Sequence, residues 1–112
     1  MNQAQEFIKL VQENPDLPVV PMVDAEVVGN DNYGWWLGSF GHCEVTEYVC
    51  VEMYCQDRFC TRDDQDEIEE YFMNEIADND ESLSEEEIER MAHEQAEALD
   101  WVKAIVVWIG TP

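Results

Sequence analysis

The sequence contains very little positive charge. Only 5 of its 112 residues are Lys or Arg, against 27 Asp and Glu, so the formal net charge is −22 at pH 7. Binding to nucleic-acid phosphates depends on Lys and Arg, and docking on an anionic membrane does too. The composition therefore argues against direct nucleic-acid binding and membrane-surface binding. It favours partners with positive charge, either a basic protein surface or a metal cation.

Further absences narrow the function. No apolar run approaches 18 residues, and the N-terminus lacks the basic-then-apolar pattern of a secretory signal, so we expect a cytoplasmic protein. The sequence has no metalloprotease, nucleophile-elbow or phosphate-loop motif, and its many carboxylates single out no acid–base pair. We therefore expect a protein that is not an enzyme and that has no cofactor.

The four cysteines do not follow a metal-binding pattern. They are separated by six, four and four residues, at Cys43, Cys50, Cys55 and Cys60. Structural zinc sites commonly use closer pairs, and disulfides are rare in the cytoplasm. The spacing predicts four buried, reduced thiols and no metal.

The N-terminal half predicts a helix followed by strands. Apolar residues recur at helical spacing over residues 2–14, and Pro15 ends the helix because it disfavours helical backbone in the residue before it. The valine-rich residues 19–28 indicate extended backbone. A turn cluster at 29–32 predicts a hairpin whose second arm covers 33–40 and is broken up by glycines. Residues 45–59 fit either a strand buried on both faces or a helical stripe, and their β-branched and aromatic residues favour the strand.

The C-terminal half predicts two acidic helices and a closing strand. Thr61 is a candidate cap for a helix that ends near Ile76, and the pattern formed by Ser84 and Glu87 is typical of a capping box opening a second helix to about Leu99. Residues 101–109 are strongly apolar and predict a buried strand. Together the segments predict one α+β domain covering residues 1–112. It consists of an N-terminal helix, a small and mainly antiparallel sheet, two acidic helices packed on one side and a C-terminal strand.

The predicted helical hairpin, residues 61–100, concentrates the charge. It contains 17 Asp and Glu against two arginines, hence a net charge of −15. Two helices of about 15 residues are roughly 22 Å long, so their carboxylates approach the charge density of duplex DNA, one per about 1.7 Å. The residues expected to contact a partner are Asp63, Asp66, Glu67, Glu70, Asp78, Asp80, Glu81, Glu85, Glu86 and Glu89.

In size, charge, aromatic content and helical-plus-sheet layout, the chain resembles small acidic DNA-mimic inhibitors encoded by phages and mobile elements. This class includes anti-CRISPR and anti-restriction proteins and the uracil-DNA glycosylase inhibitor. The resemblance implies an inhibitor of a basic nucleic-acid-binding protein, such as a CRISPR effector, a nuclease or a repair enzyme. For a phage-encoded protein, it implies action in the bacterial host cytoplasm.

Two alternatives remain open from the sequence. Oxygen-bearing side chains recur from Asp78 to Glu89 at the ligand positions of an EF-hand calcium loop, although Leu83 occupies the position where that loop requires Gly. A divalent-cation module is therefore the second hypothesis, and an accessory protein of unknown partner is the third. His93 lies four residues from both Glu89 and Glu97, and we interpret this as a solvated helix face with one His–Glu contact.

The Trp35–Trp36 pair is the other candidate contact. If the pair lies on a strand, one ring points into the core, and the other lies at the rim or in a partner-binding patch.

Overall fold

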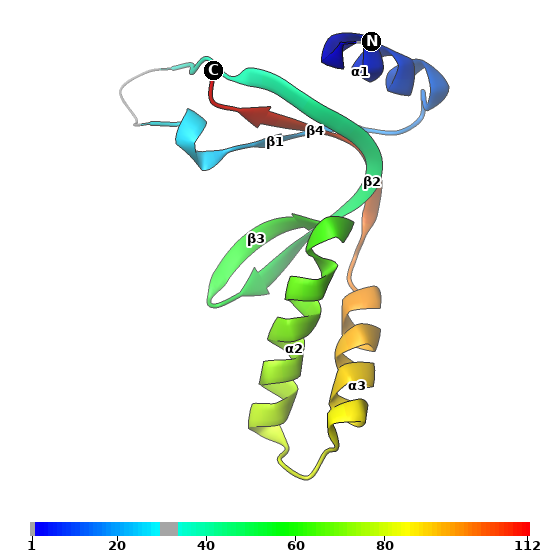
Figure 1. Ribbon diagram of the computed structural model, residues 1–112, viewed down its shortest axis with the longest axis vertical. Coiled ribbons are helices and arrows are strands. Elements are labelled where there is room, and N and C mark those ends of the chain that lie inside the picture. Colours follow the sequence, from blue (N-terminus) through cyan, green and yellow to red (C-terminus); the bar gives the residue numbers. More distant parts are fainter. Residues whose placement is uncertain (1, 30–33) are drawn as a thin grey trace. The chain divides into compact units, whose positions relative to one another are not determined.

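A computed structural model of the chain describes residues 2–29 and 34–112. These residues contain three α-helices, α1 (Gln3–Glu13), α2 (Gln65–Asn79) and α3 (Glu85–Glu97), and two short 3₁₀ turns, η1 (Ala25–Val27) and η2 (Arg62–Asp64). Four strands, β1 (Val19–Val23), β2 (Ser39–Met53), β3 (Gln56–Thr61) and β4 (Val102–Gly110), form one sheet in the order β1-β4-β2-β3 (Figure 1). The sheet is mixed and mostly antiparallel, so the predicted α+β fold with its C-terminal strand is confirmed.

The chain groups into two compact units. The first contains residues 1–46 and 103–112, and the second contains residues 47–102. The unit boundaries fall within β2 and near the start of β4, so β2 contributes residues to both units. The assignment of all 112 residues to a single domain stays a prediction.

The first unit is built around β4. Its residues Ala104–Val107 are buried, and β1 pairs with it in parallel, Val19 opposite Ile105 and Val23 opposite Ile109. The predicted hairpin between residues 19–28 and 33–40 is therefore wrong in its pairing, because the neighbour of β1 is the distant strand β4. Residues 30–33 of that predicted turn and arm lie outside the described residues.

A glycine allows close strand approach in the first unit. A Cβ atom on Gly41 would lie 2.6 Å from the backbone oxygen of Trp108 in β4. This separation is too short for a side chain, so the position requires glycine. Gly41 lies inside β2 and does not interrupt it, although the sequence analysis expected glycines to break up this part of the chain.

The second unit places both acidic helices against one face of the β2–β3 hairpin. Its core contains three residues of β2 and one residue each of β3, α2 and α3, namely Val49, Val51, Met53, Cys60, Ile68 and Ala96. α2 and α3 lie side by side and pack on one another (Figure 1). Burial of one apolar face directs the remaining, charged faces of both helices to solvent.

The ambiguous segment 45–59 is a hairpin rather than one strand. β2 and β3 are antiparallel, with Met53 opposite Gln56, and the two residues between them, Tyr54 and Cys55, have φ angles of 54° and 62°. The strand prediction is confirmed over its β-rich residues. The turn was missed because two-residue turns of this kind normally carry Asn or Gly.

Candidate acidic interaction surface

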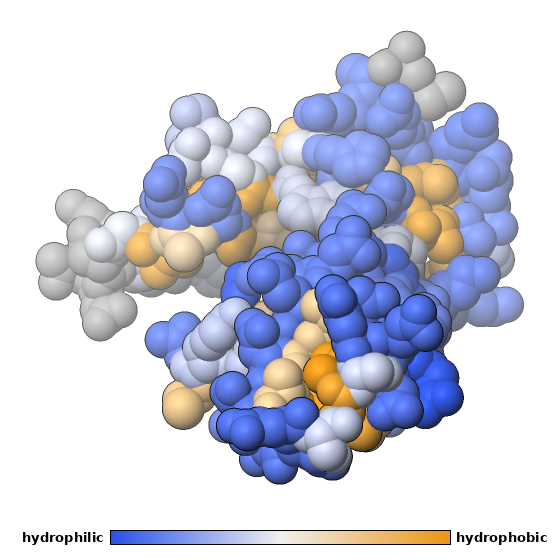
Figure 2. Space-filling model, turned by 60° about the horizontal axis from the view of Figure 1, so that its bottom comes forward, coloured by the Kyte–Doolittle hydropathy of each residue, from blue (hydrophilic) through white to orange (hydrophobic). Residues whose placement is uncertain are grey.

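All ten predicted contact residues are exposed in the second unit. Asp63 lies in η2, four of them lie in α2, Asp80 and Glu81 lie in the connection, and the remaining three lie in α3. We call the exposed carboxylates between residues 63 and 97 the acidic surface. It has 14 members, which include these ten. Figure 2, viewed toward the end of α2 and α3 where they are connected, shows hydrophilic residues over most of this end and a strip of hydrophobic residues between them.

Local sequence explains how the helices are held in place. Thr61 precedes the 3₁₀ turn η2, and its backbone N–H donates a hydrogen bond to Asp64 Oδ2 at 2.9 Å. The α-helix α2 begins only after this turn, at Gln65. Ser84 begins α3 as predicted, because its Oγ accepts a hydrogen bond from the Glu87 backbone N–H at 3.2 Å. Ser84 thus satisfies one of the free N–H groups of the first helical turn.

Few of these carboxylates have a basic partner. In the described residues, three members pair with arginines: Glu67 Oε1 with Arg58 Nη1 at 2.8 Å, Glu94 Oε1 with Arg90 Nε at 3.9 Å and Glu97 Oε2 with Arg62 Nη1 at 3.4 Å. The second unit holds 20 of the 27 acidic residues against three arginines, hence a formal charge of −17. The acidic surface therefore keeps most of its charge for interaction with solvent or a partner.

Arg62 connects β2, α2 and α3. Its Nε donates to Glu47 Oε1 at 3.0 Å, its Nη1 donates to Gln65 Oε1 at 3.0 Å, and Nη1 also lies 3.4 Å from both Glu97 carboxylate oxygens. The guanidinium carbon lies 4.0 Å from the centre of the Trp101 ring. The hydrogen bond from Gln65, together with the charge of Arg62, lowers the pKa of Glu97. Arg62 is thus structural, a role that the sequence analysis did not identify.

The connection between the helices does not have the form of an EF-hand calcium loop, which the sequence left open as an alternative. α2 continues to Asn79 and α3 starts at Glu85, so only five residues separate them. Asp80 Oδ1 accepts hydrogen bonds from the Ser82 hydroxyl and backbone N–H, and the hydroxyl is the larger cause of the lowered pKa of Asp80. Across residues 2–29 and 34–112, no group of three or more His, Cys, Asp and Glu side chains could hold a metal ion. The geometry thus gives no support to the calcium hypothesis.

His93 makes its contact across the helix pair. Its Nδ1 lies 3.2 Å from Glu69 Oε1 of α2, whereas Glu97 is engaged by Arg62 and Gln65. The single His–Glu contact expected from the sequence is present, but its partner is neither of the two glutamates on the same helix.

The four cysteines are free, and two of them are exposed. Cys43 and Cys60 are buried, while Cys50 and Cys55 are exposed, which corrects the prediction of four buried thiols. Burial is the main cause that raises the pKa of both buried thiols, with nearby Glu6 or Asp64 carboxylates as the next cause. Cys43 and Cys50 are seven residues apart in β2 and therefore point to opposite faces, whereas Cys55 lies in the turn between β2 and β3.

The two tryptophans differ in exposure as expected, but they do not lie on a strand. Trp35 is 93% exposed and Trp36 is half-buried, and both precede β2 in irregular backbone. Trp35 is therefore the exposed member of the pair, as an aromatic contact residue would be.

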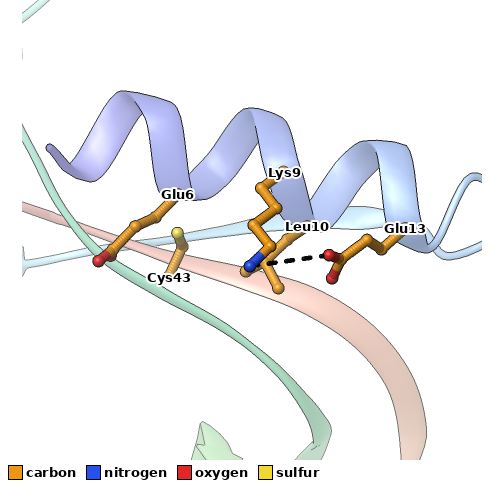
Figure 3. A pocket seen from close by; sticks show the side chains of 5 residues that line it. All are labelled: Glu6, Lys9, Leu10, Glu13 and Cys43. Carbon is orange, nitrogen blue, oxygen red and sulfur yellow. Dashed lines mark ion pairs between the residues drawn. The ribbon is translucent and has the colours of Figure 1, made fainter. Parts of the chain in front are cut away.

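The first unit contains a small hollow beside α1. Its volume is about 270 Å³, and Glu6, Lys9, Leu10 and Glu13 of α1 line it together with Cys43 of β2 (Figure 3). Lys9 Nζ lies 3.9 Å from Glu13 Oε1, so the one lysine of the hollow is paired with a lining carboxylate. The lining offers no cluster of polar groups that converge on a ligand.

No described helix is long and apolar enough to cross a membrane. Comparison of the chain with known proteins found no matching family model, no similar curated protein and no similar solved structure.

Proposed function

We propose that this chain is an acidic interaction protein that inhibits a basic nucleic-acid-binding enzyme by presenting DNA-like charge. The observation that carries the proposal is the exposure of the 14 carboxylates of the acidic surface on one compact unit. This is the behaviour of the phage-encoded anti-CRISPR and anti-restriction inhibitors that the sequence resembles. Targets of this chemistry include a CRISPR effector, a nuclease or a DNA-repair enzyme.

The charge density supports the proposal quantitatively. α2 has 15 residues and is roughly 22 Å long at about 1.5 Å per residue. Distributed over this length, the 14 exposed carboxylates correspond to one negative charge per about 1.6 Å, against about 1.7 Å for duplex DNA. Eleven of the 14 lie on α2 and α3, whose apolar faces pack on the core, so the helices carry them on solvent-facing positions.

The energetic cost of this arrangement also supports an interaction role. A net charge of magnitude about 2–8 suffices for the solubility of a small domain. Like charges three or four residues apart on a helix destabilise it by a few tenths of a kcal/mol per pair, and Glu85, Glu86 and Glu89 incur such repulsion. A partner lined with Lys and Arg would offset this repulsion when it binds.

The mechanism of inhibition is competitive occupation of a nucleic-acid channel. The field of the acidic surface steers the basic partner toward it, so association is fast at low ionic strength and slower once salt shortens the screening length to about 8 Å. No single carboxylate dominates, since each exposed ion pair contributes about 0–1 kcal/mol.

The test uses purified bacterial enzymes of three classes: a CRISPR effector nuclease, a restriction endonuclease and a uracil-DNA glycosylase. Competition between the protein and a fluorescent DNA substrate is measured at low and high salt. The test variant neutralises Asp66, Glu70, Glu85, Glu86 and Glu89 as Asn or Gln, which leaves a net charge of −17.

The control variant neutralises five carboxylates of the first unit, which leaves the same net charge. These are Glu6, Glu13, Asp16, Glu26 and Glu44. We expect wild type and control to compete, and the test variant to lose competition while melting at the same or a higher temperature. Equal competition by both variants would show that the acidic surface is not the binding site, and Trp35 would become the better candidate.

A further inference from the structure

The face of the β2–β3 hairpin that points away from the helices, its outer face, carries an exposed aromatic ring and an exposed thiol. Val49 and Cys60 are opposite one another and buried against the helices, while the adjacent opposite pair, Cys50 and Phe59, is exposed. The Phe59 side chain is 67% exposed. Because neighbouring strand residues point to opposite faces, Cys50 and Phe59 lie on the face away from α2 and α3.

One pair of carboxylates lies beside this exposed ring on the same face. Glu52 and Asp57 are opposite one another in the register, and both are exposed on the same face as Phe59. Like charges directly opposite on a sheet destabilise it. The hairpin therefore combines an uncovered aromatic ring with a pair of repelling carboxylates, and neither feature improves the stability of the isolated protein.

The turn of the hairpin is also locally unfavourable. Tyr54 and Cys55 both adopt positive φ, 54° and 62°, a backbone region in which side chains other than Gly, Asn and Asp are uncommon. The Tyr54 ring is 62% exposed and packs edge-on against Tyr71 of α2, with 4.9 Å between ring centres. This contact anchors the turn to the helix, so the hairpin presents its outer face from a fixed support.

Charge decides which partner can cover this face. A second copy would bring two units of −17 together and would place four carboxylates around the ring pair, and an anionic membrane would be repelled in the same way. A basic surface that also carries an apolar or aromatic platform would pair with the two carboxylates and cover the Phe59 ring. Sites for unpaired nucleic-acid strands have this chemistry, because a basic groove follows the phosphates and aromatic side chains stack on the bases.

We infer that the outer face of the β2–β3 hairpin docks in an unpaired-strand binding site, with Phe59 in the place of a stacked base and the Glu52–Asp57 pair in the place of nearby phosphates. This inference rests on the proposed function, which supplies a basic partner, and adds a contact on the hairpin face opposite the helices that carry most of the acidic surface. Among basic nucleic-acid enzymes, the partner is one whose groove holds an unpaired strand.

The experiment compares two classes of probe. The unpaired-strand probes are a single-stranded-DNA-binding protein, a single-strand exonuclease and a CRISPR effector with an opened target, each with a labelled oligonucleotide. The duplex probe is a helix-turn-helix repressor on its labelled operator. Displacement of each label by wild type is compared with displacement by Phe59→Ser, Phe59→Tyr and Trp35→Ser, the last as a matched loss of an exposed aromatic outside the hairpin.

We expect wild type to displace the label from at least one unpaired-strand probe. At that probe, Phe59→Ser should require about tenfold more protein, which corresponds to about 1.4 kcal/mol of lost stacking, while Phe59→Tyr and Trp35→Ser should match wild type. Phe59 is exposed, so the fold of the Ser variant should persist, which circular dichroism verifies.

The other outcomes overturn the inference in distinguishable ways. If wild type displaces only the duplex label, or if Phe59→Ser competes as well as wild type, the docking face is wrong and the proposed charge mimicry stands. If Trp35→Ser is the weakened variant, the aromatic contact lies in the first unit instead. If wild type displaces no label from either class, both the inference and the proposed function are rejected.

Discussion

Replacement of Arg62 by Met tests whether one half-buried cation stabilises the second unit. The Arg62 side chain is only 28% exposed, lies over the Trp101 ring and contacts Glu47 and Glu97. Met preserves much of the aliphatic stem and removes the charge and the planar group. The variant therefore leaves two carboxylates without their shared cation while the packing volume changes little.

The magnitude follows from the two contacts that solvent screens least. A cation over an indole ring at a partly buried site contributes about 1 kcal/mol, and the short Glu47 pair contributes about 0.5–1 kcal/mol. Arg62→Met should therefore lower the free energy of unfolding by about 2 kcal/mol. For a chain of this length, about 1 kcal/mol shifts the melting temperature by about 4 °C, so we expect a decrease of about 8 °C.

Thermal unfolding followed by far-ultraviolet circular dichroism measures this change, with Arg62→Lys as the matched control. Lysine keeps the charge but lacks the planar fork that contacts three acceptors at once, so its melting temperature should lie between the other two. A melting temperature for Arg62→Met within 2 °C of wild type would refute the reasoning, because the network would then contribute no net stability.

Three further outcomes are expected. Ile68→Ala, at a side chain with no exposed surface, should cost about 2–5 kcal/mol in urea unfolding, and a smaller loss would show that the core around it relaxes. A thiol reagent should modify Cys50 and Cys55 in the native protein and the two buried thiols only after unfolding, so four equal rates would contradict the burial assignment. Because the pKa of Glu97 is lowered in the fold, its charge stabilises the protein above the pKa of the unfolded state and ceases to do so as pH falls through the folded pKa. Wild type should therefore melt above Glu97→Gln at pH 7, and a gap that persists after the pH has fallen through the folded pKa of Glu97 would assign the effect to something other than this charge.

Features set by neighbouring residues were predicted well from the sequence. The helix predicted over residues 2–14 is α1. Its N-cap is Asn2, whose side chain accepts a hydrogen bond from the Gln5 backbone N–H, and its C-cap is Asn14. The strand predicted over residues 101–109 is β4, displaced by one residue. The exposure of the acidic surface could also be predicted from the sequence, because a helix that buries one apolar stripe must direct its carboxylates outward.

Features that depend on distant residues were not predicted. Parallel pairing of β1 with β4 joins segments more than 80 residues apart, and no local pattern encodes it. Arg62 gains its role only when Glu47, Glu97 and Trp101 meet around it. The exposed Phe59 was assigned to a buried segment because β-propensity does not tell which strand face the helices cover.

The second unit should be more stable with bound cations than without them. It carries −17 around a core of six buried residues, so repulsion opposes packing, and any cation that binds the folded form preferentially stabilises it by mass action. Spermine, a flexible tetracation without a required geometry, should raise the melting temperature of wild type more than that of the variant neutralised at Asp66, Glu70, Glu85, Glu86 and Glu89. The control neutralised in the first unit should respond like wild type. Equal shifts in the two variants, both smaller than that of wild type, would mean that spermine responds to total charge alone, and the acidic surface would then have no local advantage for a basic partner.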